Sequence, residues 1–265
     1  MALPTKKLFL GLIEELIKEM IKKLAGILLL TGTSFAAISQ DSATKKRYSR
    51  PDLPGIFTVE LALNRGLDAP DNFDLGLWGS RTINIYYQYE IRILKSKFSL
   101  VPGIGVSLER FKFRNGHILQ YAGASDDSVM LLAPADSKDL YPNLRKVQLI
   151  NNYIDLPVEL RFTSNPDDPA RSLKISVGAR IGYMYDAFNK LKFKQDGEVK
   201  QIKDKQFYNL NRIRYGVYGK IGIGNISLFG YYNVSPMFKE GKGFQEAGIP
   251  NDFNTMTIGI SLAAF

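Results

Sequence analysis

The chain has 265 residues, enough for one large domain or two small ones. It contains no cysteine, which excludes disulfide bonds, thiolate metal sites, thiol catalysis and a lipid anchor on cysteine. Lysine and arginine number 35 against 26 aspartate and glutamate, a formal charge of +9. Because these basic residues are scattered along the sequence and form no dense patch in it, we expect no nucleic-acid partner.

Residues 1–39 are expected to be a secretory signal peptide. Starting at Met20, a short basic segment precedes the apolar stretch 24–30 and the small residues 34–39, and cleavage could follow Ala36 or Ser39. Residues 1–19 place Leu and Ile at helical spacing among charged residues. Either translation starts at Met20, which we favour, or an amphipathic extension precedes the signal. A periplasmic linker is expected at 40–54, and a barrel domain at 55–265.

Beyond residue 55 the apolar and polar residues alternate with a period of two. Alternation of this kind predicts strands with one apolar and one polar face, because successive side chains of a strand point to opposite sides. The clearest cases are 83–93, 150–162, 173–186 and 212–223, and weaker ones are 56–65, 97–113, 226–235 and 253–265. No segment beyond the N-terminus has the roughly 20 apolar residues of a membrane-spanning helix.

The links between these eight strands alternate in length. Long links are expected at 66–79, 114–146, 187–209 and 236–252, and short ones at 95–96, 164–169 and 224–225. Bacterial outer-membrane barrels show this alternation when both chain ends lie in the periplasm. The sequence therefore predicts an all-β fold: an eight-stranded antiparallel up-and-down transmembrane β-barrel with short periplasmic turns and long extracellular loops, located in the outer membrane.

Aromatic residues are expected to form girdles at both edges of this barrel. At the periplasmic ends of the strands they are Phe57, Phe98, Phe162 and Phe265, and toward the outside they are Tyr183, Tyr185, Tyr215 and Tyr232.

The polar faces of the predicted strands carry six acids and seven bases, so their charges nearly cancel. In an eight-stranded barrel these faces form a narrow lumen that side chains just fill. Ions there must pair, because a lone buried partner costs roughly 3–5 kcal/mol. We therefore predict a closed lumen with an ion network of Glu60, Glu90, Arg92, Glu109, Asp155, Glu159, Arg161, Lys174, Arg180, Asp186, Arg212, Arg214 and Lys220. The alternative is a secreted, soluble barrel whose charged faces meet water.

Four segments resemble the PorT-like outer-membrane β-barrel proteins of Bacteroidetes. They are YIDLPVELRF (153–162), GARIGY (178–183), NVSPMFK (233–239) and the closing IGISLAAF (258–265). The resemblance implies an outer-membrane location and insertion by the barrel-assembly machinery through the C-terminal aromatic Phe265. It also implies mostly unassigned roles, one branch being linked to protein export. Partners expected at this location are outer-membrane lipid, lipopolysaccharide and an envelope or export protein.

Three positions depart from a regular strand pattern. Phe265 does not share the parity of the apolar residues of the last strand, so a bulge is expected near Ala263 and Ala264. Pro102 and Pro157 fall inside predicted strands, where each removes a ladder hydrogen bond, and bulges are expected there too.

The sequence offers little for catalysis, and we expect no enzyme, cofactor or metal site. His117 is the single histidine, so a hydrolase would depend on it and on the nearby Ser125, Asp126 and Asp127. A glycine-rich run at 219–224 lacks the helix that a nucleotide-binding loop requires.

The most specific surface feature is the lysine-rich link at 187–209, in which Asp196-Gly197 is a hairpin turn signal. We expect a basic β-hairpin that meets lipid phosphates, acidic glycans or a protein, or that serves only solubility. The sequence thus favours a closed structural or interaction barrel acting through its extracellular loops, with a link to export or envelope assembly. The alternatives are a narrow small-solute channel and a secreted ligand-binding barrel.

Overall fold

The computed structural model describes residues 55–121, 129–134, 136–244 and 253–264. The predicted signal peptide and linker, and the predicted assembly signal Phe265, lie outside the described residues. In the part of the chain that is described, no helix is long and apolar enough to cross a membrane.

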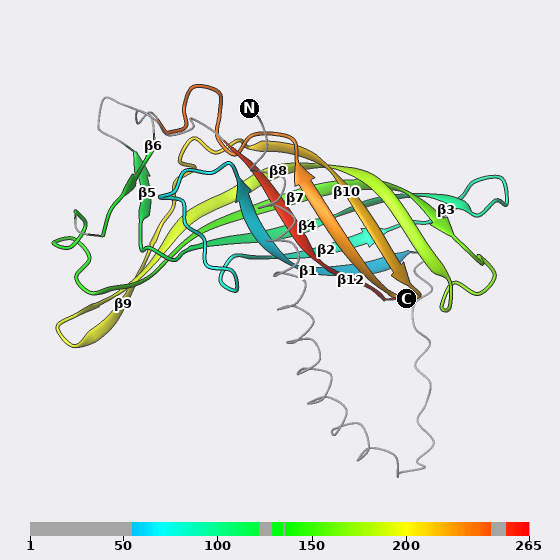
Figure 1. Cartoon of the computed structure of the whole chain (residues 1–265), viewed down its shortest axis with the longest axis horizontal. Coiled ribbons are helices and arrows are strands. Elements are labelled where there is room, and N and C mark those ends of the chain that lie inside the picture. Colours follow the sequence, from blue (N-terminus) through cyan, green and yellow to red (C-terminus); the bar gives the residue numbers. More distant parts are fainter. Residues whose placement is uncertain (1–54, 122–128, 135, 245–252, 265) are drawn as a thin grey trace, which may run out of the picture. The chain divides into compact units, whose positions relative to one another are not determined.

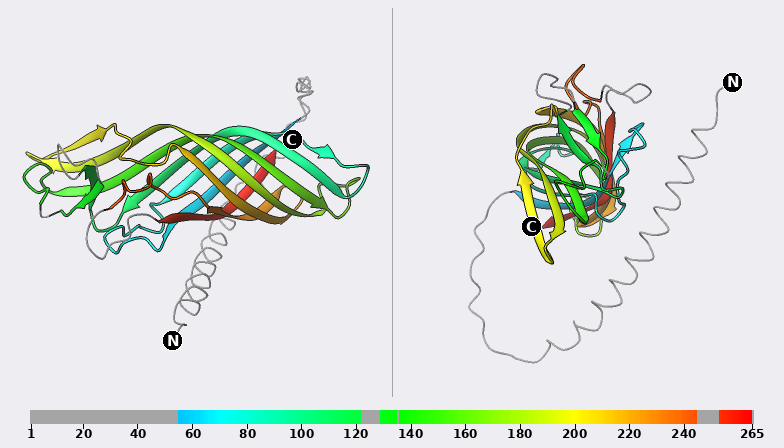
Figure 2. Two further views of the ribbon diagram at one scale, coloured as in Figure 1. Left: turned by 90° about the horizontal axis from the view of Figure 1, so that it is seen from above. Right: turned by 90° about the vertical axis from the view of Figure 1, so that its left-hand side faces the viewer.

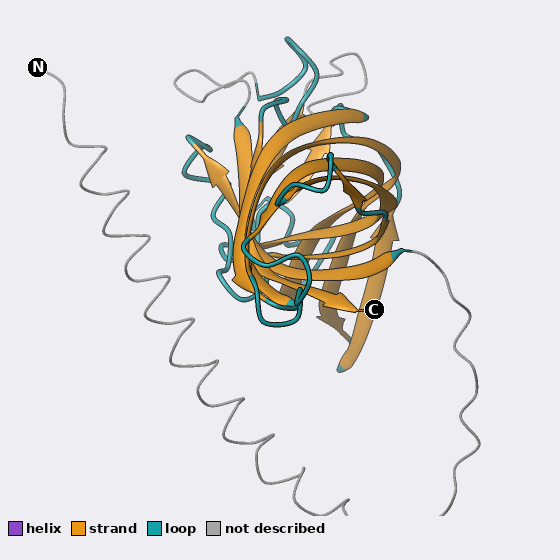
Figure 3. Cartoon of the chain, turned by 90° about the vertical axis from the view of Figure 1, so that its right-hand side faces the viewer, coloured by secondary structure: helices purple, strands orange, loops and turns teal. Residues whose placement is uncertain are grey.

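Eight antiparallel strands close into a ring (Figure 3). They are β1 (Ile56–Leu67), β2 (Arg81–Gln88), β4 (Phe98–Phe113), β7 (Leu144–Thr163), β8 (Leu173–Gln195), β10 (Ile213–Ile223), β11 (Ile226–Asn233) and β12 (Asn254–Ala264). Each strand pairs with the next, and β12 pairs with β1 to complete the ring. The predicted eight-stranded up-and-down barrel is therefore confirmed.

Four shorter strands complete the structure. The two-residue β3 (Ile91–Arg92) pairs with β4, and β5 (Ile118–Tyr121) forms a separate hairpin with β6 (Val129–Leu132). β9 (Glu198–Asp204) pairs with the outer part of β8. Asp196 and Gly197 join these two strands with φ angles of 53° and 85°, the left-handed conformation of a tight hairpin turn. The hairpin predicted from the lysine-rich link is thus confirmed.

The connections sort to the two ends of the barrel by length, as predicted. Short links at 89–97, 164–172 and 224–225 lie at one end, which we call the short-turn end, together with the first residue of β1 and the last of β12. The longer links lie at the opposite loop end, where β5, β6 and β9 extend beyond the ring. In Figure 1 the loop end is on the left and the short-turn end on the right, and Figure 2 shows the barrel from another side and from its loop end.

The outer surface of the ring is apolar and its interior polar. In β10, for example, Ile213, Tyr215 and Val217 are about half exposed, whereas Arg214 and Lys220 are buried. At the short-turn end, outward-facing rings pair across strands, with centroids 5.2 Å apart for Phe57 and Tyr87 and 5.4 Å for Phe98 and Phe162. An apolar band of this extent has no favourable place in water.

A β-bulge changes the orientation of side chains along β8. The pairing of β7 with β8 shifts by one residue between Asn152 and Tyr153, so that Tyr185 is the extra residue on β8. Before the bulge the odd-numbered residues of β8 face outward, and after it the even-numbered residues do. Beyond Tyr185 the inward face of β8 becomes largely apolar and its outward face basic.

The bulges predicted at three other places are not found. β12 pairs with β1 in one continuous register from Asn254 to Ala264, so there is no extra residue near the end of the described strand. Between Pro102 and Gly105 the pairing of β4 with β7 is interrupted but keeps its register, and Pro157 pairs with β8 without a shift. Proline lacks an N–H donor, so here it removes hydrogen bonds without adding a residue.

A hydrophobic cluster, which we call the cap, fills the loop end. The inward faces of β4, β7 and β8 change from polar to apolar there, and the hairpin β5–β6 and the long loops pack against them. Its buried members include Phe73, Phe111, Phe113, Leu119, Val147, Leu149, Leu191, Tyr208, Leu210, Phe238, Phe244 and Phe253. Isolated bridges such as Leu210 with Phe238 and Val129 with Phe244 link the loops to one another.

Candidate functional site

Nine charged side chains inside the barrel form one continuous chain of ion pairs. At the short-turn end, Arg161 Nη1 lies 2.9 Å from Glu90 Oε2, and its Nη2 pairs with Glu159 Oε1. Lys220 Nζ then bridges two acids, 3.1 Å from Glu159 Oε2 and 2.9 Å from Glu60 Oε1. Arg161, Glu159, Lys220 and Glu60 come from the inward faces of strands, whereas Glu90 lies in the link after β2. Glu60 and Glu159 are almost completely buried.

The same chain of ion pairs continues toward the loop end. Arg180 Nη2 lies 3.3 Å from Glu60 Oε2, and its Nη1 lies 3.7 Å from Asp155 Oδ2. Arg214 Nη2 lies 2.7 Å from the same Asp155 oxygen, while its Nη1 pairs with Glu109 Oε1. Five carboxylates and four bases therefore alternate along the lumen from one end to the other.

Aromatic rings fill the space around these ions. The Tyr86 hydroxyl donates a hydrogen bond to Asp155 Oδ2 at 2.8 Å. The Arg214 guanidinium lies 3.8 Å from the centroid of the Tyr153 ring, and that of Arg180 lies 4.4 Å from the centroid of Tyr231. Desolvated cations gain from such contacts with ring faces. The lumen is therefore a packed polar core.

Two cavities that reach this polar core are very small. One, with a volume of about 10 Å³, is lined by residues that include Glu109, Asn151 and Arg214. The other, with a volume of about 20 Å³, is lined by residues that include Arg161 and Lys220. Each has room for roughly one water molecule. Buried polar atoms without a protein hydrogen-bond partner, such as Asn151 Oδ1, could bind such waters.

The structure brings together ten of the thirteen residues predicted for the lumen. Besides the nine in the chain of ion pairs, Lys174 is buried and lines the same small cavity as Arg161 and Lys220.

The other three predicted lumen residues lie elsewhere, each for a local reason. Arg92 lies on β3, where the chain turns, and its side chain is exposed and donates to the carbonyl oxygens of Ser96 and Lys95. Asp186 follows the bulge and lies on the outward face, where its Oδ1 is 3.8 Å from Lys205 Nζ. Arg212 precedes the first residue of β10 and is exposed.

Polar groups also stabilise the cap. The Tyr208 hydroxyl donates a hydrogen bond to Asp204 Oδ2 at 2.7 Å. Burial, together with the neighbouring Asp204 carboxylate, raises the pKa of Tyr208. The amide of the buried Asn189, on β8, donates to the carbonyl oxygen of Leu119 on β5. These bonds hold loops and strand extensions in one arrangement.

The residues considered for catalysis do not form a described site. His117 is partly buried just before β5, and its backbone N–H donates to Asn115 Oδ1 at 3.3 Å. Ser125, Asp126 and Asp127 lie outside the described residues. Among the residues that are described, no group of three His, Asp or Glu side chains could hold a metal ion.

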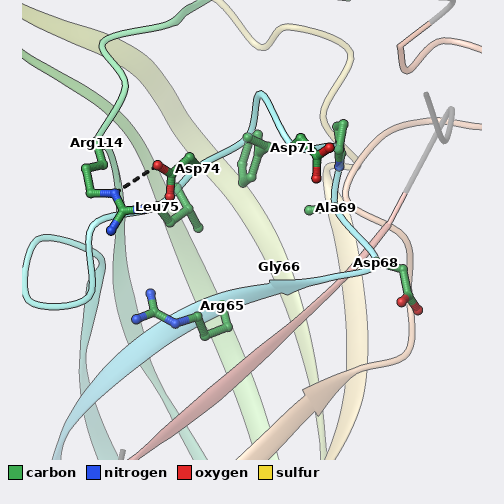
Figure 4. Close-up of a pocket in the computed structure, with 10 residues that line it drawn as sticks. Arg65, Gly66, Asp68, Ala69, Asp71, Asp74, Leu75 and Arg114 are labelled. Carbon is green, nitrogen blue, oxygen red and sulfur yellow. Dashed lines mark hydrogen bonds and ion pairs between the residues drawn. The ribbon is translucent and has the colours of Figure 1, made fainter. Parts of the chain in front are cut away.

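A surface pocket with a volume of about 400 Å³ lies in the loop after β1 (Figure 4). Its lining includes Arg65, Asp68, Asp71, Asp74 and Arg114, and Arg114 Nε lies 2.8 Å from Asp74 Oδ2. Sequence reasoning missed this pocket and the cap, because the loops show no periodicity. The cap did leave one signal: the inward positions at the outer ends of three strands are apolar.

A known protein family matches most of this chain. Residues 31–239 match the family model described as an outer membrane protein beta-barrel domain. Among solved structures, Ail, the attachment invasion locus protein of Yersinia pestis, is 14% identical with a TM-score of 0.29, covering 79% of this chain and 97% of that one. A second structure of Ail, in complex with the heparin analogue sucrose octasulfate, is 13% identical with a TM-score of 0.29, covering 80% and 100%. No curated protein matches the sequence.

The family match covers most of the chain and overturns the secreted, soluble alternative. It also accounts for the apolar outer surface of the ring, which faces lipid. The chain therefore belongs to the outer membrane protein beta-barrel domain family, and it is located in the outer membrane.

Proposed function

We propose that this protein is a closed barrel that conducts no solutes and acts as a structural or interaction protein through its extracellular cap and loops. The observation that carries the proposal is the continuous chain of nine paired charges along the lumen. The proposal includes no catalysed reaction.

Opening a path for solutes would require these pairs to separate inside the barrel. Leaving one partner of a buried pair without the other costs about 3–5 kcal/mol, and a path along the whole lumen crosses several pairs. An eight-stranded ring has no spare width, because side chains just fill its interior. The cap adds a second barrier at the extracellular end.

Large apolar side chains exposed on the loops support an interaction role. Leu140 is 67% exposed and Trp78 is 44% exposed, and both lie on loop-end links. Tryptophan is a frequent anchor in protein–protein interfaces, and burial of the exposed Leu140 against a partner would add apolar contact area. The resemblance of four segments to PorT-like proteins supports a partner that takes part in export or envelope assembly.

Planar lipid bilayers test the closed state. We expect the folded full chain to add no conductance above that of the bilayer alone. Insertion is verified on the same sample by the faster migration of unboiled protein in a gel. Stepwise conductance from the wild-type barrel would instead favour a narrow solute channel and overturn the proposal.

Photocrosslinking in cells tests the interaction role. A crosslinking amino acid at Leu140 is expected to form one discrete protein adduct. The matched control is Val177, which is 60% exposed but lies on the lipid-facing surface and should form no such adduct. If neither Leu140 nor Trp78 yields an adduct that the control lacks, the interaction role is wrong.

A further inference from the structure

Basic side chains from five neighbouring strands gather on the outward surface beyond the bulge. The expectation that the scattered basic residues form no dense patch is therefore wrong. We call this patch the basic face, and it consists of Arg81, Arg110, Lys112, Lys146, Lys190, Lys192 and Lys203.

Strand register places these cations directly beside one another. Three ladder pairs join like charges: Arg81 of β2 opposes Arg110 of β4, Lys146 of β7 opposes Lys192 of β8, and Lys190 of β8 opposes Lys203 of β9. Lys112 lies in the same cross-strand row as Lys190, with Gln148 between them. From the usual spacings of strands and residues, the patch measures roughly 19 Å across the five strands and roughly 13 Å along them.

Acidic groups do not neutralise this patch. Among the described residues, none of the seven cations has a carboxylate within 4.0 Å. The outward-facing Asp186 is nearby along β8, but it pairs with Lys205. Asp204 of β9 lies on the opposite side of the hairpin, where it accepts the hydrogen bond from Tyr208.

Burial and, after it, mutual repulsion lower the pKa of two of these lysines, which lie outside the membrane-spanning part of the strands. Burial, and then the charges of Lys192 and Lys203, lowers the pKa of Lys190. Burial, and then the charge of Lys112 followed by those of Lys192 and Lys190, lowers the pKa of Lys146. Like charges placed directly opposite one another destabilise a sheet. A bound anion would offset this cost.

The position of the basic face relative to the membrane indicates where that anion comes from. Along the outward side of β8, the exposed Tyr183 and Tyr185 are followed by Phe188 and then by Lys190. Tyrosines mark the interface between lipid and water. Lys190 is five residues beyond Tyr185, roughly 16 Å along the strand, and a tilt near 45° brings this to about 12 Å in height. Flexible lysines at this height reach phosphates of the headgroup layer.

We propose that the basic face binds the phosphorylated sugar headgroup of lipopolysaccharide in the outer leaflet, while the acyl chains contact the apolar surface below. Clusters of four to eight basic residues next to a membrane-spanning segment are typical binding sites for phosphorylated lipid headgroups. Arg81 and Arg110 provide planar donors that can bind phosphate oxygens in pairs. This proposal goes beyond the proposed function and does not depend on whether the lumen is closed.

The test compares lipopolysaccharide binding by the full chain, folded in lipid nanodiscs, with that of two triple variants. Lys112→Gln/Lys190→Gln/Lys192→Gln removes three charges from the basic face. A control with the same net charge, Lys138→Gln/Lys200→Gln/Lys239→Gln, removes two lysines of the loops and one from the opposite face of β9. Affinity should fall about tenfold or more in the first variant and change by less than about twofold in the control. The unboiled gel shift verifies that each variant is folded.

A second comparison identifies the ligand chemistry. Lipopolysaccharide whose phosphates have been removed enzymatically should bind the wild-type chain as weakly as intact lipopolysaccharide binds the first triple variant. Equal binding of the two lipids, or equal loss in both triple variants, would overturn the proposal. Preferential binding of a soluble polysulfated glycan or a nucleic acid at the same lysines would also overturn it, because the face would then be a receptor for soluble polyanions.

Discussion

Replacing Arg214 with methionine tests whether the lumen ions stabilise the barrel by pairing. Arg214 is 1% exposed, and its guanidinium contacts Glu109, Asp155 and the ring of Tyr153. In the variant Asp155 keeps the hydrogen bond from Tyr86 and the ion pair with Arg180 at 3.7 Å, but Glu109 loses its ion-pair partner among the described residues. Because one buried carboxylate is left unpaired, we expect the free energy of unfolding to fall by about 3–5 kcal/mol.

The measurement is equilibrium unfolding by urea in lipid vesicles, followed by the fluorescence of Trp78, the single tryptophan, and by the gel shift. Arg212→Met is the matched control, because Arg212 is exposed and its main contact is the Phe207 ring, with the centroid 4.0 Å away. It should cost less than about 1 kcal/mol. Equal losses for the two variants would refute the assignment of Arg214 to a desolvated ion network.

A double variant separates pairing from packing. Adding Glu109→Gln to Arg214→Met removes the carboxylate that the first change leaves unpaired. We expect the double variant to be more stable than the sum of the two single effects predicts, with a coupling of about 2 kcal/mol. Strictly additive losses would show that Arg214 stabilises the barrel by packing alone.

Two further predictions concern single contacts. A Cβ on Gly182 would meet Asp155 Oδ1, whereas nothing lies within 4 Å of one on Gly230. Gly182→Ala should therefore lower the free energy of unfolding in urea by about 1–3 kcal/mol, and Gly230→Ala should leave it unchanged. Equal effects of the two substitutions would contradict this. Tyr208→Phe removes the hydrogen bond to Asp204 and should cost about 1–2 kcal/mol at pH 8. Since the folded-state pKa of Tyr208 is raised, this stabilisation is complete below the unfolded-state pKa of about 10 and is lost as pH rises through the folded-state value. A difference in unfolding free energy between wild type and variant that stays constant from pH 8 to 11.5 would contradict this prediction.

The barrel and most of its interior could be predicted from the sequence because strand geometry is strictly periodic. Alternation of apolar and polar residues determines which face each residue occupies, and link lengths then determine how the strands are arranged. The prediction assigned Glu60, Asp155, Arg180 and Arg214 to the lumen on parity alone, and the structure places all four there.

The prediction was wrong where periodicity stops. Tyr185 is an extra residue that the sequence does not mark, so Asp186 was assigned to the wrong face. Arg92 and Arg212 lie at strand ends, where the backbone leaves the ring. The cap and the basic face combine residues from segments far apart in the chain, and only the register of several strands brings those residues together.

The bulge at Tyr185 determines which side chains of the following part of β8 face inward and which face outward. Deleting that one residue would exchange the two sides of the following segment, turning Leu191 and Phe193 toward water and Lys190 and Lys192 into the cap. Adding or removing residues at the Asp196–Gly197 turn would not change which side chains of β8 face inward or outward. We therefore expect relatives to vary in length at the tip of this hairpin and to keep the residue count between Leu173 and Gln195.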